Sequence, residues 1–196
     1  MSDYLILDLK QHPKYMLEFQ RVLQLIEKSN DALKENYRNL NPHNFERFTT
    51  LIKDGKIMAF SALQIDEQKW FPETGRAITR AWKDDSLRVI GKFSDGDESV
   101  FRNYNIPDQL EHAKKIGLKT IFISRESKPR AFQNWLDGVN SVNNTNFEIL
   151  PIQYNVCGNI CPVPESCVQW IAIHEIIPGG KEHWIKSMSE FCINST

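Results

Sequence analysis

The stretch QLEHAKKIGLKTIFIS, Gln109 to Ser124, contains the clearest helix-to-strand transition in the chain. A helix is predicted to begin near Pro107, because proline is favoured in the first turn, where an N–H donor has no intrahelical partner. Gly117 suits the position just after the helix, where a positive φ is common. The apolar run that follows it predicts a short buried strand. The stretch therefore predicts a helix followed at once by a strand inside a sheet.

Three more strands are predicted upstream of this unit. FERFTTLIKDGKIMAFSALQI, 45–65, reads as two strands around Asp54-Gly55, a pair that tolerates the positive φ of a primed hairpin turn. GRAITRAW, 75–82, predicts the third strand. Because this strand is followed by a helix and then by another strand, the order predicts a parallel strand pair with a right-handed crossover.

Helices are predicted elsewhere along the chain. In 13–30 the apolar residues recur at the three- and four-residue spacing of one helical face. A second short helix is expected at 31–37, and a last one within 181–192. KPRAFQNWLDGV, 128–139, predicts a helix that ends near Gly138.

The remaining segments complete a mixed sheet. The polar segments 94–106 and 140–146 are interpreted as loops, while 147–156 and 167–177 predict two final strands. The fold class is therefore α/β (α+β), with a mixed sheet of about six to seven strands flanked by helices. We expect a single domain over 1–196, in which 1–43 form an N-terminal helical portion.

The composition is that of a soluble globular protein. Hydrophobic residues make up 41% of the 196 residues and charged residues 25%, with a net charge of -1. This balance offers no basic excess for nucleic acid or for an anionic membrane. The N-terminus lacks the features of a secretory signal, and no apolar run is long enough to span a membrane. A cytoplasmic protein with reduced cysteines is expected.

The order and spacing of these pieces resemble the GNAT superfamily of acetyl-CoA-dependent N-acetyltransferases over roughly 44–175. DGKIMAFSAL resembles the early hairpin of the family, and AWKDDSLRVIG resembles its central strand with the start of the acyl-CoA loop. QLEHAKKIGLKTIFIS resembles the next helix and strand, and KPRAFQNWLDGV the helix after them. The resemblance implies a sheet that is splayed at its centre and an N-acetyltransferase that uses acetyl-CoA as cosubstrate, without a metal.

The resemblance also implies which residues contact acetyl-CoA. The loop of the family has the form Arg or Gln, two residues, Gly, one residue, then Gly or Ala. Its backbone N–H groups and those of the next helix hold the pyrophosphate. The residues that the resemblance places along acetyl-CoA are Trp82, Lys83, Arg88, Val89, Ile90, Gly91 and Lys92.

Three features of the sequence depart from the family pattern. Phe93 stands where the loop usually has a small residue, and 94–106 separates the loop from the helix. Trp135 stands where the family often has a tyrosine that gives a proton to the leaving thiolate. An indole N–H is a poor acid near neutral pH. These departures keep open a second reading, a degenerate GNAT fold that only binds a partner or CoA.

Candidate catalytic and substrate residues come from the ends of the predicted strands. Glu73 and Asp84 lie near the central strand, and Tyr154 lies near the end of a late strand. Arg80 is a candidate for an acidic acceptor or a phosphate, and Ser124 ends the neighbouring strand. The expected acceptor is a primary amine of a small molecule or peptide, and the sequence leaves the oligomeric state open.

A third reading rests on three cysteines. Cys157, Cys161 and Cys167 have the spacing C-x3-C-x5-C, and thiolates can hold zinc or an iron–sulfur cluster. The spacing lacks the C-x2-C pair of common zinc sites. Buried small thiols explain the same residues, so a small metal-binding protein stays an alternative to the transferase.

Overall fold

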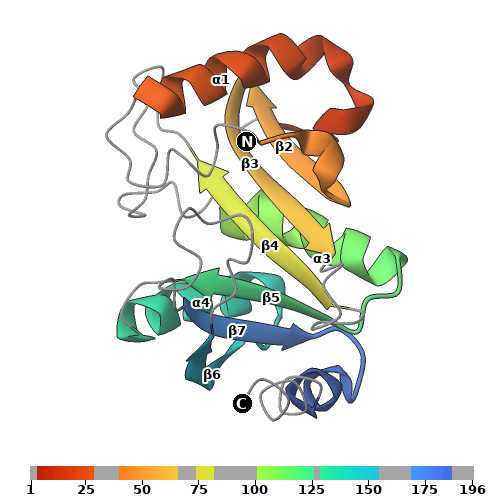
Figure 1. Cartoon of the computed structure of the whole chain (residues 1–196), viewed down its shortest axis with the longest axis vertical. Coiled ribbons are helices and arrows are strands. Elements are labelled where there is room, and N and C mark those ends of the chain that lie inside the picture. Colours follow the sequence, from red (N-terminus) through yellow and green to blue (C-terminus); the bar gives the residue numbers. More distant parts are fainter. Residues whose placement is uncertain are drawn as a thin grey trace, which may run out of the picture.

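A mixed seven-stranded sheet forms the centre of the computed structural model, which describes residues 4–28, 40–65, 74–81, 101–125, 129–154 and 169–186 (Figure 1). The strand order is β1-β2-β3-β4-β5-β7-β6, and among these neighbours only β4 and β5 are parallel. The strands are β1 (Leu5–Asp8), β2 (Arg47–Lys53), β3 (Lys56–Ile65), β4 (Thr74–Ala81), β5 (Thr120–Arg125), β6 (Glu148–Tyr154) and β7 (Gln169–Glu175). The predicted mixed sheet with a parallel pair is confirmed.

Helices cover both faces of the sheet (Figure 1). The longer ones are α1 (Met16–Lys28), α3 (Ile106–Lys115) and α4 (Pro129–Asn143), and residues 180–186 are also helical. Short 3-10 helices span Leu9–Gln11, Pro13–Tyr15 and Pro42–Asn44, and a π-helix, Phe101–Asn105, leads into α3. In Figure 1, α3 and α4 lie behind the sheet, whereas α1 and 180–186 lie in front of it.

The β2–β3 hairpin forms where the sequence predicts it. Asp54 and Gly55 have φ values of 52° and 75°, the two positive values that a type I′ turn requires. The register runs from Arg47 opposite Leu63 to Lys53 opposite Lys56. This turn fixes which side chains of the two strands face each side of the sheet.

Alternation along β2 and β3 separates two cores. Phe48 and Phe60 point toward α1, where Phe19 contacts both rings at centroid distances of 5.2 and 5.6 Å. Leu63 is an odd number of residues from Phe60 along β3 and therefore points to the opposite face, where it packs in the core beneath α3 and α4. The core beside 180–186 is a third cluster, in which Phe122 packs on Trp184 at 6.4 Å.

Three features differ from the sequence prediction. α3 begins at Ile106, beside Pro107 as predicted, but the π-helix at 101–105 replaces the end of the predicted loop 94–106. The next helix does not end near Gly138 but continues to Asn143, and Gly138 lies against the Arg102 side chain of the π-helix. The chain also has an edge strand, β1, within the portion expected to be helical, and it pairs with β2.

Candidate functional site

The parallel pair at the centre of the sheet separates along its length. β4 and β5 pair only at Thr74–Thr120, Gly75–Ile121 and Arg76–Phe122. Beyond these pairs β4 continues to Ala81, still paired with β3, and β5 continues to Arg125, still paired with β7. Beyond Arg76 and Phe122, the backbone N–H and C=O groups on the facing edges of β4 and β5 are therefore not paired between these two strands. An extended chain carrying amides could pair with such edges as an added strand does.

The structure brings several predicted site residues to this end of the sheet. The backbones of Arg80 in β4 and Ser124 in β5 both lie beyond the last β4–β5 pair. Tyr154 ends β6 opposite Gln169, the first residue of β7, and so lies at the same end of the sheet. The backbones of these three residues therefore lie at one end of the sheet, and their roles in the site stay predictions.

The other predicted site residues lie outside the described residues. They are the acyl-CoA contacts Trp82, Lys83, Arg88, Val89, Ile90, Gly91 and Lys92, the loop residue Phe93, the carboxylates Glu73 and Asp84, and the cysteines Cys157, Cys161 and Cys167. Their roles stay predictions.

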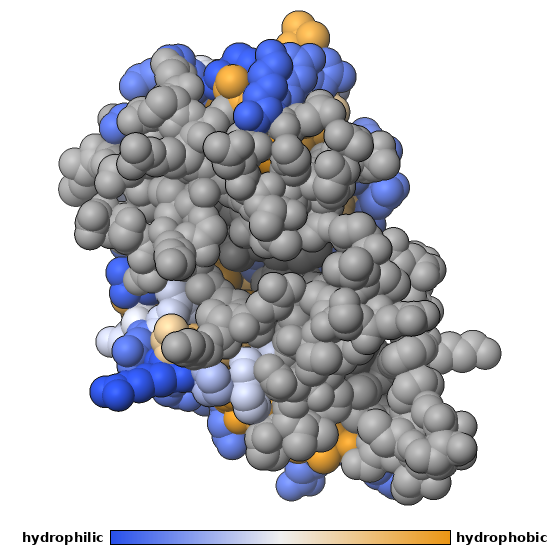
Figure 2. Space-filling model, turned by 60° about the vertical axis from the view of Figure 1, so that its left-hand side comes forward, coloured by the Kyte–Doolittle hydropathy of each residue, from blue (hydrophilic) through white to orange (hydrophobic). Residues whose placement is uncertain are grey.

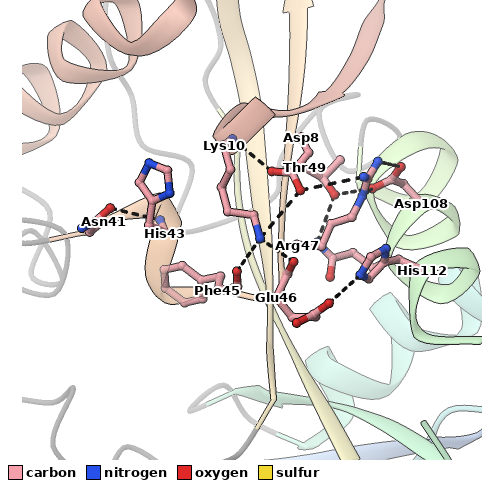
Figure 3. A network of polar contacts seen from close by, with 11 residues as sticks. Asp8, Lys10, Asn41, His43, Phe45, Glu46, Arg47, Thr49, Asp108 and His112 are labelled. Atoms are coloured by element: carbon pink, nitrogen blue, oxygen red, sulfur yellow. Dashed lines mark hydrogen bonds and ion pairs between the residues drawn. The ribbon is translucent and has the colours of Figure 1, made fainter. Parts of the chain in front are cut away.

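A polar network joins helix α3 to strand β2 (Figure 3). The Arg47 guanidinium donates to Asp108 from Nε at 2.8 Å and from Nη2 at 2.6 Å, and the Thr49 hydroxyl donates to the same carboxylate. This two-pronged bond to Asp108 raises the pKa of Arg47 against the opposing effect of burial. Because both guanidinium bonds are directional, they fix α3 in rotation as well as in distance.

The network continues into the buried interface between α3 and β3. The Gln109 amide donates to Ser61 Oγ at 2.9 Å and to Thr49 Oγ1 at 3.2 Å, and Asn105 donates to Ser61 Oγ at 3.2 Å. Gln109, Asn105, Ser61 and Thr49 are all fully buried. The first turns of α3 are therefore held on the sheet by polar contacts.

Contacts at the margin of the network hold the entry to β2 (Figure 3). Lys10 donates to the carbonyl oxygens of Phe45 and Glu46 at 2.8 and 2.6 Å. The Glu46 carboxylate lies 3.1 Å from Nε2 of His112 on α3. His112 thus has a structural role, joining the residue before β2 to the second turn of α3.

Trp135 belongs to the core. It is 4% exposed and stacks on Phe132 at 6.3 Å, in the cluster that joins α3, α4, β5 and β7. Ala131, at the family's small position, is exposed. The part of α4 that the structure describes therefore supplies no acid at the position where the family often has a tyrosine.

His174 on β7 also has a structural role. It is 9% exposed, accepts the Asn146 backbone N–H at Nδ1 over 3.3 Å, and packs on Phe147. Burial, followed by the charge of Lys114, lowers the pKa of His174. The imidazole ties the segment just before β6 to β7.

The surface offers few features of its own. On the face in Figure 2, the coloured residues show hydrophobic atoms only in small separate areas. Within the described ranges, no group of three or more His, Cys, Asp or Glu side chains is arranged to hold a metal ion. None of the described helices combines the length and apolar character needed to cross a membrane.

Solved structures with the same arrangement are acetyltransferases. An N-acetyltransferase from Staphylococcus aureus Mu50 aligns with a TM-score of 0.55 at 12% identity, covering 90% of this chain and 100% of that one. An acetyltransferase of the GNAT family from Streptococcus pneumoniae gives 0.55 at 12% identity, covering 87% and 98%. The chain has the fold of the GNAT acetyltransferases.

A third match concerns a ligand. A Bacillus subtilis acetyltransferase, solved in complex with CoA, aligns with the GNAT fold of this chain at a TM-score of 0.50 and 13% identity, covering 81% and 93%. No protein-family model matches the chain, and no curated protein matches it in sequence. The similarity is therefore one of fold.

Sequence reasoning missed the residues that hold this GNAT fold around its centre. Arg47, Thr49 and Ser61 lie on predicted strands, but the spacing of two between Arg47 and Thr49 was the only signal that these side chains share a face. Arg102 was placed in a loop, where its relation to Gly138 of α4 has no signature in the sequence.

Proposed function

We propose that the chain is an N-acetyltransferase that moves the acetyl group of acetyl-CoA to a primary amine of a small molecule or peptide. The observation that carries this proposal is the short ladder between β4 and β5, which ends at Arg76 and Phe122 while both strands continue. The pantetheine arm of CoA contains two amides on an extended chain, and the unused backbone groups of β4 and β5 suit such a chain. The fold shared with acetyltransferases supports the same reading.

The remaining contacts are assigned from the sequence. Trp82 and Lys83 follow directly after the last residue of β4, where the separated edge of β4 ends. Arg88, Val89, Ile90, Gly91 and Lys92 are proposed to contact the phosphates through backbone N–H groups and basic side chains. Arg80 and Ser124 are proposed to face the acceptor, because their backbones lie at the same end of the sheet.

Transfer is proposed to occur by direct attack of the amine on the thioester carbonyl. The amine must lose a proton before or during the attack, and Glu73, Asp84 and Tyr154 are the candidate bases. The leaving thiolate would depart without a side-chain acid from the Trp135 position, because that indole is buried in the core. CoA leaves as a thiolate in this scheme, which places the mechanism among those that need no tyrosine.

A second candidate is a GNAT fold that binds CoA without transferring an acetyl group. The burial of Trp135 favours it, because an indole held in the core cannot give a proton to a leaving thiolate. Both candidates bind CoA, but only the first transfers an acetyl group. Measuring binding and transfer on the same purified protein therefore distinguishes them.

The deciding experiment is a thermal unfolding titration with acetyl-CoA and with CoA, followed by an assay of thiol release with a panel of amines. A ligand at about 100 times its Kd stabilises the folded protein by about 2.7 kcal/mol. A shift with thiol release supports the transferase, and a shift without release for any amine supports the binding protein. No shift at millimolar concentrations of either ligand would contradict both.

A further inference from the structure

We propose that Arg102, in the π-helix before α3, binds a phosphate group of the acyl donor. This inference rests on the proposed use of acetyl-CoA and assigns the anion contact to a residue outside the predicted loop 88–92. It starts from a cation that lacks a partner. Among the described residues Arg102 makes no hydrogen bond or ion pair, and its Nε is buried without an acceptor.

The backbone around Arg102 is held in place by its neighbours. Tyr104, two residues on, packs its ring on Tyr4 at 5.1 Å, and Asn105 is buried and bonded to Ser61. The π-helix also contacts both β4 and α4. The π-helix that carries Arg102 therefore packs against the strand whose edge is proposed to receive the acyl donor. π-helical turns of this kind occur often at functional sites.

Gly138 on α4 provides the space for Arg102. A Cβ atom at Gly138 would lie 2.5 Å from Arg102 Nη1 and 3.3 Å from its Cδ, so a larger residue here would displace the end of the Arg102 side chain. Glycine inside a helix costs about 1 kcal/mol relative to alanine. The helix α4 thus accepts a less stable residue at the one point where the guanidinium lies against it.

The chemistry of the partner follows from charge and shape. A half-buried guanidinium without a counter-ion is unfavourable, and near the start of a helix it also opposes the helix dipole. A phosphate group removes both penalties, since it matches the planar fork of arginine and is attracted to the first turn of a helix. CoA carries two sources of this chemistry, the pyrophosphate and the 3′-phosphate.

The first test measures the Kd of CoA, dephospho-CoA and pantetheine for the wild type and for Arg102→Ala. We expect Kd for CoA to rise by about 10- to 100-fold, as for loss of a hydrogen bond between charged groups. An equal rise for dephospho-CoA assigns the pyrophosphate, and a rise for CoA alone assigns the 3′-phosphate. No rise for CoA, or an equal rise for pantetheine, overturns the proposal. Lys115→Ala, an exposed cation at the far end of α3, is the matched control.

The second test uses the opposing helix. Gly138→Ala adds a methyl group that must move Arg102, while it makes α4 intrinsically more stable. We expect a rise in Kd for CoA similar to that of Arg102→Ala, no loss of thermal stability, and no further rise in the double variant. Ser141→Ala, on an exposed position of the same helix, controls for helix stabilisation. Unchanged CoA binding by Gly138→Ala would contradict the proposed geometry.

The outcomes also separate this inference from the proposed function. If the wild type binds CoA and both variants bind it equally well, Arg102 is not the contact and the acetyltransferase proposal stands. If the wild type does not bind CoA at all, the proposed function itself fails.

Discussion

Helices α3 and α4 cover the same face of the sheet but are attached to it by different physics. α4 presents Phe132, Trp135, Leu136 and Val139 to a core that is apolar on both sides. α3 adds to that core with Leu110 and Ala113, but its edge toward β2 and β3 consists of Asp108, Gln109 and Asn105 bonded to Arg47, Thr49 and Ser61. The apolar contacts supply stability, whereas the directional hydrogen bonds of α3 fix its orientation on the sheet.

The difference bears on the proposed site. Apolar packing tolerates small shifts and rotations of a helix, whereas a bidentate Arg47–Asp108 bond allows only one arrangement. The π-helix that carries Arg102 leads directly into α3. We infer that the polar edge positions α3, and with it the proposed phosphate contact, while α4 anchors the sheet that α3 lies on.

The largest expected effect is on the apolar side. Phe132→Ala removes a fully buried ring from the contact of α4 with the sheet, and should lower the free energy of unfolding by about 3–5 kcal/mol. Urea denaturation measures it. Val142→Ala, at an exposed position of the same helix, should change stability by less than about 0.5 kcal/mol. A loss below about 1 kcal/mol for Phe132→Ala would refute the division of roles.

An intermediate effect is expected on the polar side. Asp108→Ala leaves Arg47 without its main partner, at a cost of about 2 kcal/mol, below the range for fully buried pairs because both side chains keep some exposure. Asp137→Ala, which removes an exposed carboxylate of α4 that accepts a hydrogen bond from Gln133, is the matched control.

The same network can be tested for its effect on the orientation of α3, separately from its effect on stability. The double change Arg47→Met with Asp108→Leu should recover much of the lost stability, because well-packed apolar residues often replace an ion pair without loss. It should not recover CoA affinity if the bidentate bond positions α3. Full recovery of both quantities would mean that the polar edge contributes stability alone.

The smallest effect concerns pH. Burial holds the pKa of His174 below its ordinary value of 6.5, so the unfolded chain takes up a proton that the folded protein resists. The free energy of unfolding should therefore fall as the pH drops below about 6.5 toward the folded-state pKa. His174→Gln should show a weaker dependence between pH 7.5 and 5.5 in urea denaturation. An equal slope in the two proteins would remove this contribution.

Much of the fold could be predicted because its signals are local. The turn at Asp54-Gly55, the C-terminal glycine at Gly117 (φ 79°) and the apolar period of 16–28 each depend on neighbours in sequence. The parallel pair followed from element order. β1 could not be predicted, since a four-residue edge strand with Leu5 and Ile6 exposed has no clear pattern.

The errors in the helices have one physical origin. Gly138 looks like a helix end, and 101–105 looks like a loop, when each is read alone. In the structure each explains the other, because Arg102 of the π-helix occupies the space that Gly138 leaves. Contacts between residues 36 positions apart carry no local signal, and the same holds for the pairing of Arg47 with Asp108.

The central claim is that the free edges of β4 and β5 receive the extended arm of acetyl-CoA. Hydrogen exchange of backbone amides, with and without saturating acetyl-CoA, tests it most directly. The account predicts slower exchange in 77–81 of β4, beyond its last pair with β5, and little change in the β2–β3 hairpin. Protection of the hairpin alone, or no protection in 77–81 by acetyl-CoA at a concentration far above its Kd, would contradict the account.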